Sequence, residues 1–72
     1  MKDIIVTGNV YEQLSWLQDH VGFYIETNQY GEILGDGWKI LFIYNEYSIL
    51  NDKQRVFIDD DNFATEFILR FV

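Results

Sequence analysis

The chain has 72 residues and carries twelve Asp and Glu against five Lys and Arg, which gives a formal net charge of -7 at pH 7. This length excludes a second core, so we expect one compact domain over residues 1–72. Its 2 Trp, 5 Tyr and 6 Phe exclude a disordered acidic tail, because disordered segments are poor in aromatic residues.

The chain has no cysteine, which excludes a disulfide framework and a thiolate metal site and favours a reducing compartment. The N-terminal apolar stretch is too short for a signal peptide. The longest apolar run, residues 40–44, is far below the length that spans a membrane. We therefore expect a cytoplasmic protein that does not insert into membranes.

The first predicted elements are a strand at residues 4–6 and a helix that begins at Val10. Asn9 stands three residues before Glu12, a spacing in which the Asn side chain caps the first turn and the Glu side chain reaches back. Spacings of four, three and four predict one buried apolar face, made by Val10, Leu14, Leu17 and Val21. Gly22 follows where a left-handed residue would end the helix.

The middle of the chain is predicted to form strands joined by turns rich in glycine. Residues 23–27 are the first candidate, and turn residues follow it before a brief apolar pair at 33–34. Residues 38–44 are apolar on both alternating faces, so we expect this strand to be central in the sheet and covered on both sides.

A further hairpin is predicted from residues 47–50 and 55–58, which flank the turn residues 51–54. Residues 45–50 are also compatible with a single helical turn. Either way the chain continues into a strand that ends just before three consecutive aspartates.

The C-terminus is predicted to be an amphipathic helix, because Phe63, Phe67 and Phe71 recur every four residues, with Ala64 and Ile68 widening the same face. On its outer side, Glu66 and Arg70 have the spacing of an exposed ion pair. The predicted order is β-α-β-β-β-β-α, which favours an α+β domain with two helices on a mainly antiparallel sheet of four to five strands.

Three features that can indicate chemistry do not have the spacing that the chemistry requires. His20 and Ser15 point apart on one helix, at about 140° from each other, so no nucleophile and base pair is expected. Gly31, Gly35 and Gly37 precede a strand and not a phosphate-binding helix. The aspartates at 59–61 do not fit a calcium loop. We predict no catalytic residue, no cofactor and no metal, and therefore no enzyme.

Trp16 is the most specific candidate for a contact residue, since it lies about 130° from the centre of the predicted apolar face. It should therefore face solvent between Glu12 and Asp19, as an interface anchor does. The alternative is that a loop or strand covers it. Leu69 is also off its helix seam, where it would make a dimer contact or pack under the preceding hairpin.

The acidic charge points to a basic protein partner, such as a nuclease or another nucleic-acid-binding protein. Rigid carboxylates can compete with phosphates for Lys and Arg, which predicts inhibition by occlusion. In size, charge and lack of a catalytic set, the chain is similar in kind to inhibitors that bacteriophages make against host nucleases, including anti-restriction and anti-CRISPR proteins. The predicted contact residues are Glu12, Trp16, Asp19, Asp59, Asp60, Asp61 and Glu66.

Two other functions are compatible with the sequence. The first is an assembly module or homodimer with an apolar interface around Trp16 and Leu69. The second is a minimal hydrolase that uses paired acids, although a domain this small has little room for a ligand cleft. Direct binding of nucleic acid is not expected, because the net charge repels the phosphate backbone.

Overall fold

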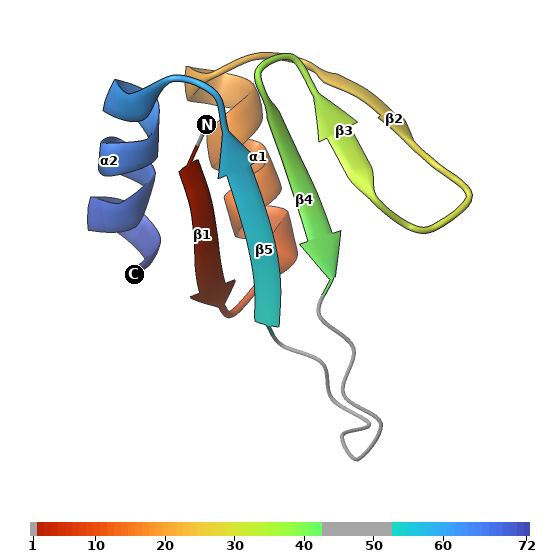
Figure 1. Cartoon of the computed structure of the whole chain (residues 1–72), viewed down its shortest axis with the longest axis horizontal. Coiled ribbons are helices and arrows are strands. Elements are labelled where there is room, and N and C mark those ends of the chain that lie inside the picture. Colours follow the sequence, from red (N-terminus) through yellow and green to blue (C-terminus); the bar gives the residue numbers. More distant parts are fainter. Residues whose placement is uncertain (1, 43–52) are drawn as a thin grey trace.

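The computed structural model describes residues 2–42 and 53–72, and these form a five-stranded antiparallel sheet with two helices (Figure 1). The predicted α+β class and the order β-α-β-β-β-β-α are confirmed. The elements are β1 Lys2–Thr7, α1 Val10–His20, β2 Tyr24–Thr27, β3 Ile33–Gly35, β4 Trp38–Phe42, β5 Lys53–Ile58 and α2 Asp61–Phe71. The first strand of the predicted hairpin, residues 47–50, and the alternative helical turn at 45–50 lie outside the described residues.

The strand order in the sheet is β1-β5-β4-β3-β2, so β4 is central as predicted. Both helices pack on one face, where alternate strand residues are buried together with Leu17 of α1 and Phe67 of α2. On the other face, Lys39 and Leu41 of β4 are only half-buried. The prediction that this strand is covered on both sides is therefore wrong. The buried apolar core consists of Ile4, Val6, Leu17, Trp38, Ile40, Val56, Ile58, Ala64 and Phe67.

Short polar side chains begin both helices. The Asn9 side chain accepts a hydrogen bond from the Tyr11 amide at 2.8 Å. Asp60 accepts from the amides of Asn62 and Phe63 at 2.8 and 3.2 Å. Each cap satisfies amides in the first turn that have no partner within the helix. The predicted start of α1 at Val10 is confirmed.

Gly22 is required after α1 for a different reason from the predicted one. Its φ is not positive, whereas Gly8, Gly31 and Gly37 have positive φ values, so the prediction of a left-handed cap is wrong. A Cβ atom on Gly22 would lie 2.2 Å from the backbone oxygen of Asp36. The residue is glycine because the turn between β3 and β4 approaches it closely.

Trp38 stabilises the contact between Gly22 and the β3–β4 turn. Its indole Nε1–H donates to the carbonyl oxygen of Gly22 at 2.7 Å, and the Asp36 amide donates to the Phe23 carbonyl at 2.9 Å. A Cβ on Gly35 would lie 2.0 Å from the Trp38 indole, so that position also has no room for a side chain. The end of α1 and the β3–β4 turn are thereby held as one unit.

The buried face of α1 is rotated from the predicted apolar seam. Its two buried residues are Gln13 and Leu17, whereas Val10, Leu14 and Val21 are only half-buried. On a helical wheel, Gln13 lies about 70° from the centre of the predicted seam, on the side of Trp16. The rotation brings Trp16 next to α2 and leaves it packed against the core.

Replacing Gln13 with methionine should raise the free energy of unfolding by about 1 kcal/mol, because a buried acceptor without a partner is costly. Gln13 is 1% exposed, and its Oε1 has no hydrogen-bond partner among the described residues. Urea unfolding measures the change, with Gln18→Met as the control at a half-buried position on the same helix. A larger loss for Gln13→Met than for the control would show that the buried amide is satisfied, for example by a bound water.

Candidate partner-binding surface

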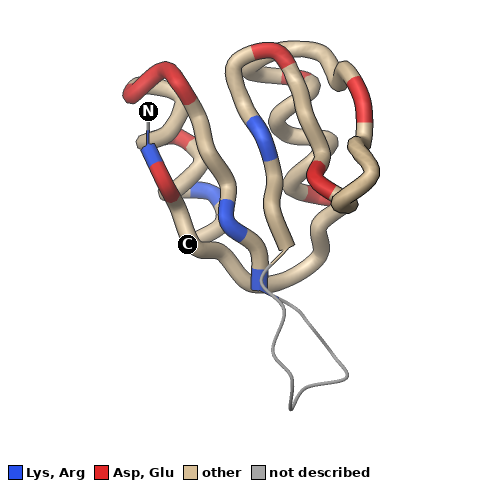
Figure 2. The backbone as a smooth tube through the Cα atoms, turned by 45° about the vertical axis from the view of Figure 1, so that its right-hand side comes forward, with Lys and Arg blue, Asp and Glu red and all other residues tan. Residues whose placement is uncertain are grey.

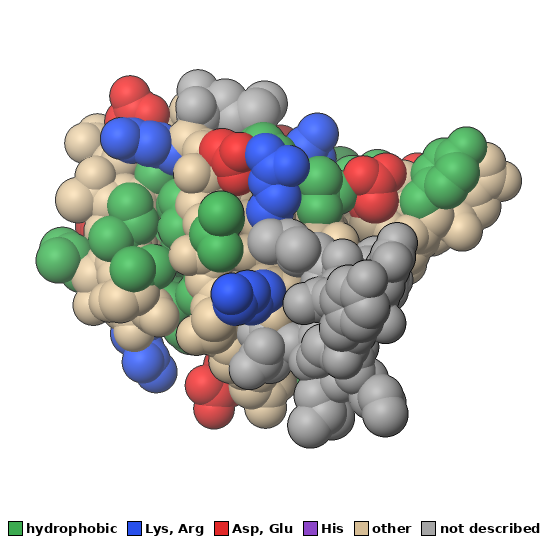
Figure 3. Space-filling view, turned by 60° about the horizontal axis from the view of Figure 1, so that its bottom comes forward, with side chains coloured by type: hydrophobic (Ala, Val, Ile, Leu, Met, Phe, Trp, Pro, Cys, Tyr) green, Lys and Arg blue, Asp and Glu red, His purple; other side chains and the backbone are tan. Residues whose placement is uncertain are grey.

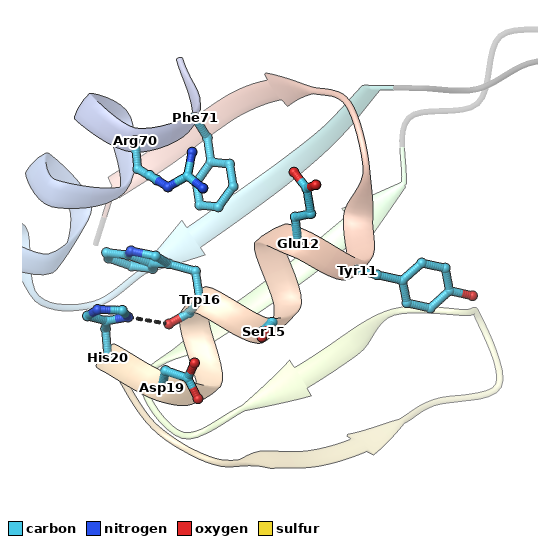
Figure 4. A pocket seen from close by; sticks show the side chains of 8 residues that line it. All are labelled: Tyr11, Glu12, Ser15, Trp16, Asp19, His20, Arg70 and Phe71. Carbon is cyan, nitrogen blue, oxygen red and sulfur yellow. Dashed lines mark hydrogen bonds between the residues drawn. The ribbon is translucent and has the colours of Figure 1, made fainter.

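The two helices enclose an open groove of about 440 Å³, which we call the helix groove (Figure 4). Most of its lining comes from the exposed side of α1, and the rest comes from the C-terminal end of α2. The lining residues are Tyr11, Glu12, Ser15, Trp16, Asp19, His20, Arg70 and Phe71. Three of the seven predicted contact residues, Glu12, Trp16 and Asp19, are thus brought together.

Trp16 forms the aromatic centre of the helix groove. Its ring stacks on His20 at a centroid distance of 4.5 Å and meets Phe67 and Phe71 edge-on at 5.6 and 6.3 Å. The prediction that Trp16 faces away from the core is therefore wrong, because aromatic residues of α2 cover one side of it. The covering element is a helix, and not the loop or strand considered as the alternative.

The His20 side chain is held in place by a hydrogen bond to the backbone of α1. Its Nδ1–H donates to the carbonyl oxygen of Trp16 at 2.9 Å, which holds the imidazole ring against the indole (Figure 4). This hydrogen bond goes to the backbone and not to Ser15, although Ser15 also lines the groove. The imidazole ring therefore covers one face of the indole, and the exposed His20 ring is itself part of the groove lining.

The charged residues of the helix groove are two carboxylates and one guanidinium. Glu12 and Asp19 are exposed, and neither forms an ion pair with a cation in the part of the chain that the structure describes. The guanidinium of Arg70 lies over the Phe71 ring, 5.2 Å from its centroid. The predicted ion pair between Glu66 and Arg70 is not formed, since Arg70 turns towards the aromatic ring.

The aspartate triplet at 59–61 does not line the helix groove. It stands at the N-terminal end of α2, whereas the groove includes the C-terminal end, about 14 Å away along the helix. Asp60 uses a side-chain oxygen to cap α2, so one of the three acids has a structural role. Glu66 is exposed on α2 but does not line the groove. The acidic positions are spread over several parts of the molecule (Figure 2).

Basic residues occupy the sheet face opposite the helices. Lys39 and Arg55 lie over the Phe57 ring, at 4.9 and 5.3 Å from its centroid. Arg55 also forms an ion pair with Asp3, and its hydrogen bond lowers the pKa of the Asp3 carboxyl. Lys53 shares the face of Arg55 because it lies two residues away on the same strand. In Figure 3, Lys and Arg side chains lie among hydrophobic ones on the face shown.

The β2–β3 hairpin is a further candidate surface that the sequence patterns did not indicate. Its exposed apolar side chains include Phe23, Ile25 and Tyr30, which are 81%, 63% and 74% exposed. In Figure 1 the hairpin extends away from the helices at the edge of the sheet. The only sequence signal was the apolar run at 23–25, which we interpreted as an ordinary strand.

Comparisons of the chain with protein-family models, with curated proteins and with solved structures found no match. Within residues 2–42 and 53–72, no three His, Asp or Glu side chains are grouped in a way that could hold a metal ion. In the same part of the chain, neither helix has the length and apolar character needed to cross a membrane. The site must therefore be interpreted from its own geometry.

Proposed function

We propose that this protein is a small acidic inhibitor that binds the basic nucleic-acid-binding surface of a target protein and occludes it. The observation that carries the proposal is the helix groove, in which the exposed carboxylates of Glu12 and Asp19 border the ring of Trp16. Two carboxylates beside an aromatic face suit the guanidinium or ammonium group of a partner.

The mechanism requires carboxylates to stand in for phosphates. Nucleic-acid-binding surfaces gain most of their affinity from Lys and Arg contacts to phosphate oxygens. A target Arg could pack against the exposed His20 ring, which is stacked on Trp16, while its N–H groups donate to Glu12 or Asp19. That Arg is then no longer available to bind a phosphate. The protein needs no catalysis for this effect. It would act in the way of anti-CRISPR or anti-restriction inhibitors of bacteriophages.

The distribution of charge also favours binding of the target through the helical side of the molecule. The two helices and the two residues before α2 carry six acids and one Lys or Arg, which is Arg70. The acids are Glu12, Asp19, Glu66 and the triplet at 59–61. Three of the five basic residues, Lys39, Lys53 and Arg55, instead belong to the opposite sheet face. A basic target would therefore be attracted to the helical side, and more strongly at low ionic strength.

An assembly module is the second candidate function, and the exposure of Leu69 favours it. Leu69 is 79% exposed near the end of α2, where Val72 is 71% exposed. Trp16 adds less to such an interface than the sequence suggested, since Phe67 and Phe71 already cover part of it. An apolar interface of this kind should hold at high salt, whereas a charge-based one should weaken.

The proposal is tested by capturing partners of the tagged protein from bacterial lysate at low salt and eluting them with duplex or single-stranded nucleic acid. We expect release of a basic nucleic-acid-binding protein. With the captured protein in hand, Glu12→Gln/Asp19→Asn should weaken its binding at least tenfold, about 1.4 kcal/mol. Both residues are exposed, so folding should be unchanged.

The matched control is Asp59→Asn/Asp61→Asn, which removes the same charge at the other end of α2 and keeps the Asp60 cap. A larger effect of this control would move the contact to the aspartate triplet. The occlusion proposal is wrong if nucleic acid releases nothing, or if neither double variant changes binding. Recovery of the chain alone, in complexes that resist high salt, would favour the assembly module.

A further inference from the structure

The outer edge of β2 offers an unpaired backbone to another strand. Among residues 2–42 and 53–72, β2 is the last strand in the sheet and pairs only with β3. The Asn28 amide donates inwards to the carbonyl of Glu32 at 3.0 Å. Because successive peptide groups of a strand point to opposite sides, the amide of Thr27 points outwards, away from β3. This edge can therefore donate and accept ladder hydrogen bonds.

β2 lacks most of the features that usually prevent edge-to-edge pairing. Folded proteins protect their edge strands with Lys, Pro or a covering element. The other edge strand, β1, begins with Lys2 and packs against α2. β2 contains neither Lys nor Pro, and all four of its residues are exposed, although a bulge occurs between Tyr24 and Glu26.

The acidic residues around β2 indicate the charge of a strand that would pair with its edge. From residue 21 to residue 38 the chain carries Glu26, Glu32 and Asp36 and has no Lys or Arg. The Asn28 side chain binds Glu32 at 2.7 Å, whereas Glu26 and Asp36 are exposed. The exposed Phe23 and Ile25 provide apolar contacts next to these carboxylates. A segment with alternating cationic and apolar side chains complements this edge.

We propose that β2 accepts an extended cationic segment of the target protein as a sixth strand of the sheet. This inference rests on the proposed function, because it specifies how the basic target is held at a second place outside the helix groove. Main-chain hydrogen bonds would give affinity, and the side-chain alternation would give selectivity. A second copy of the chain is a poorer occupant, because it would bring two edges with the same acidic charge together.

The test uses the ¹⁵N-labelled protein and a synthetic peptide, acetyl-(Lys-Val)₄-amide, as the probe. NMR titration should shift the amide signals of residues 23–28 and leave those of the helix groove unchanged. Thr27→Pro removes the outward amide and no inward hydrogen bond, so it should weaken peptide binding at least tenfold. Thr27→Val is the matched control. It keeps the amide, and both variants lose the 3.0 Å contact between the Tyr24 and Thr27 hydroxyls.

Every other outcome contradicts the inference. These outcomes are the absence of shifts at millimolar peptide, shifts confined to the helix groove, equal binding by both Thr27 variants, or binding of an otherwise identical Glu-Val peptide. A doubled mass without peptide, abolished by Thr27→Pro, would show that a second copy occupies the edge. If the captured target is lost by Glu12→Gln/Asp19→Asn but not by Thr27→Pro, the inhibitor proposal stands and the strand proposal fails.

Discussion

Gly22→Ala is expected to lower the free energy of unfolding by about 3 kcal/mol, at the upper end of what overpacking costs. The new Cβ would lie 2.2 Å from the Asp36 oxygen and 2.8 Å from the Asp36 Cβ. A backbone oxygen cannot rotate away as a flexible side chain does. The β3–β4 turn must therefore move, and this pulls on the hydrogen bond from the Trp38 indole to the Gly22 carbonyl.

Urea unfolding followed by circular dichroism measures the loss, and NMR of the indole N–H reports on Trp38. The control is Gly8→Ala, because nothing lies within 4 Å of a Cβ there and the cost is confined to a backbone with φ of 113°. Gly8→Ala should leave the Trp38 signal in place. A Gly22→Ala loss no greater than the control, with an unshifted Trp38 signal, would mean that the close approach to Asp36 is absent.

The contrast between these glycines shows what the sequence could predict. Local patterns identified the start of α1 at Val10, because Asn9 acts on amides within the next turn. They also identified α2, because Phe63, Phe67 and Phe71 repeat along one helix face. The need for Gly22 comes from a contact with a turn that follows later in the chain, and no local pattern carries that information.

The residues of the helix groove were predicted in part, because some of them are related by local helix spacing and others are not. Glu12, Trp16 and Asp19 are four and three residues apart, so they share one side of α1 whatever the rest of the fold does. The orientation of that side depended on Gln13, which an apolar pattern assigns to the surface and which the structure buries. The aspartate triplet was grouped with these residues by charge alone, and none of its three residues lines the groove.

The exposed edge of β2 was beyond prediction because it depends on strand order. The sequence indicated how many strands to expect but not that β1 would pair with β5 and leave β2 at the end of the sheet. The apolar run from Phe23 to Ile25 is compatible with a central strand as much as with an edge. Only the sheet order converts that run into an exposed surface.

Phe67→Ala is expected to cost about 3 to 5 kcal/mol, the usual range for removing a buried phenylalanine. A domain of this size has a total stability of about 4 to 11 kcal/mol, so the variant should lose a large part of its free energy of unfolding. Phe67 is 0% exposed and packs against the rings of Trp16 and Phe71 at centroid distances of 5.6 and 4.7 Å. Urea unfolding and Trp fluorescence measure the change.

Leu69→Ala is the matched control, because Leu69 lies on the same helix but is 79% exposed and should change stability by less than about 0.5 kcal/mol. If Phe67→Ala does not fold, the stability of Phe67→Leu is compared with that of Leu69→Ala instead. Equal stability of the Phe67→Leu and Leu69→Ala variants would contradict the packing of α2 against Trp16. Phe67 supports Trp16 but contributes no charge, so Phe67→Leu should weaken target binding without changing how binding depends on salt concentration. Glu12→Gln/Asp19→Asn should instead reduce the salt dependence of binding and leave the free energy of unfolding unchanged.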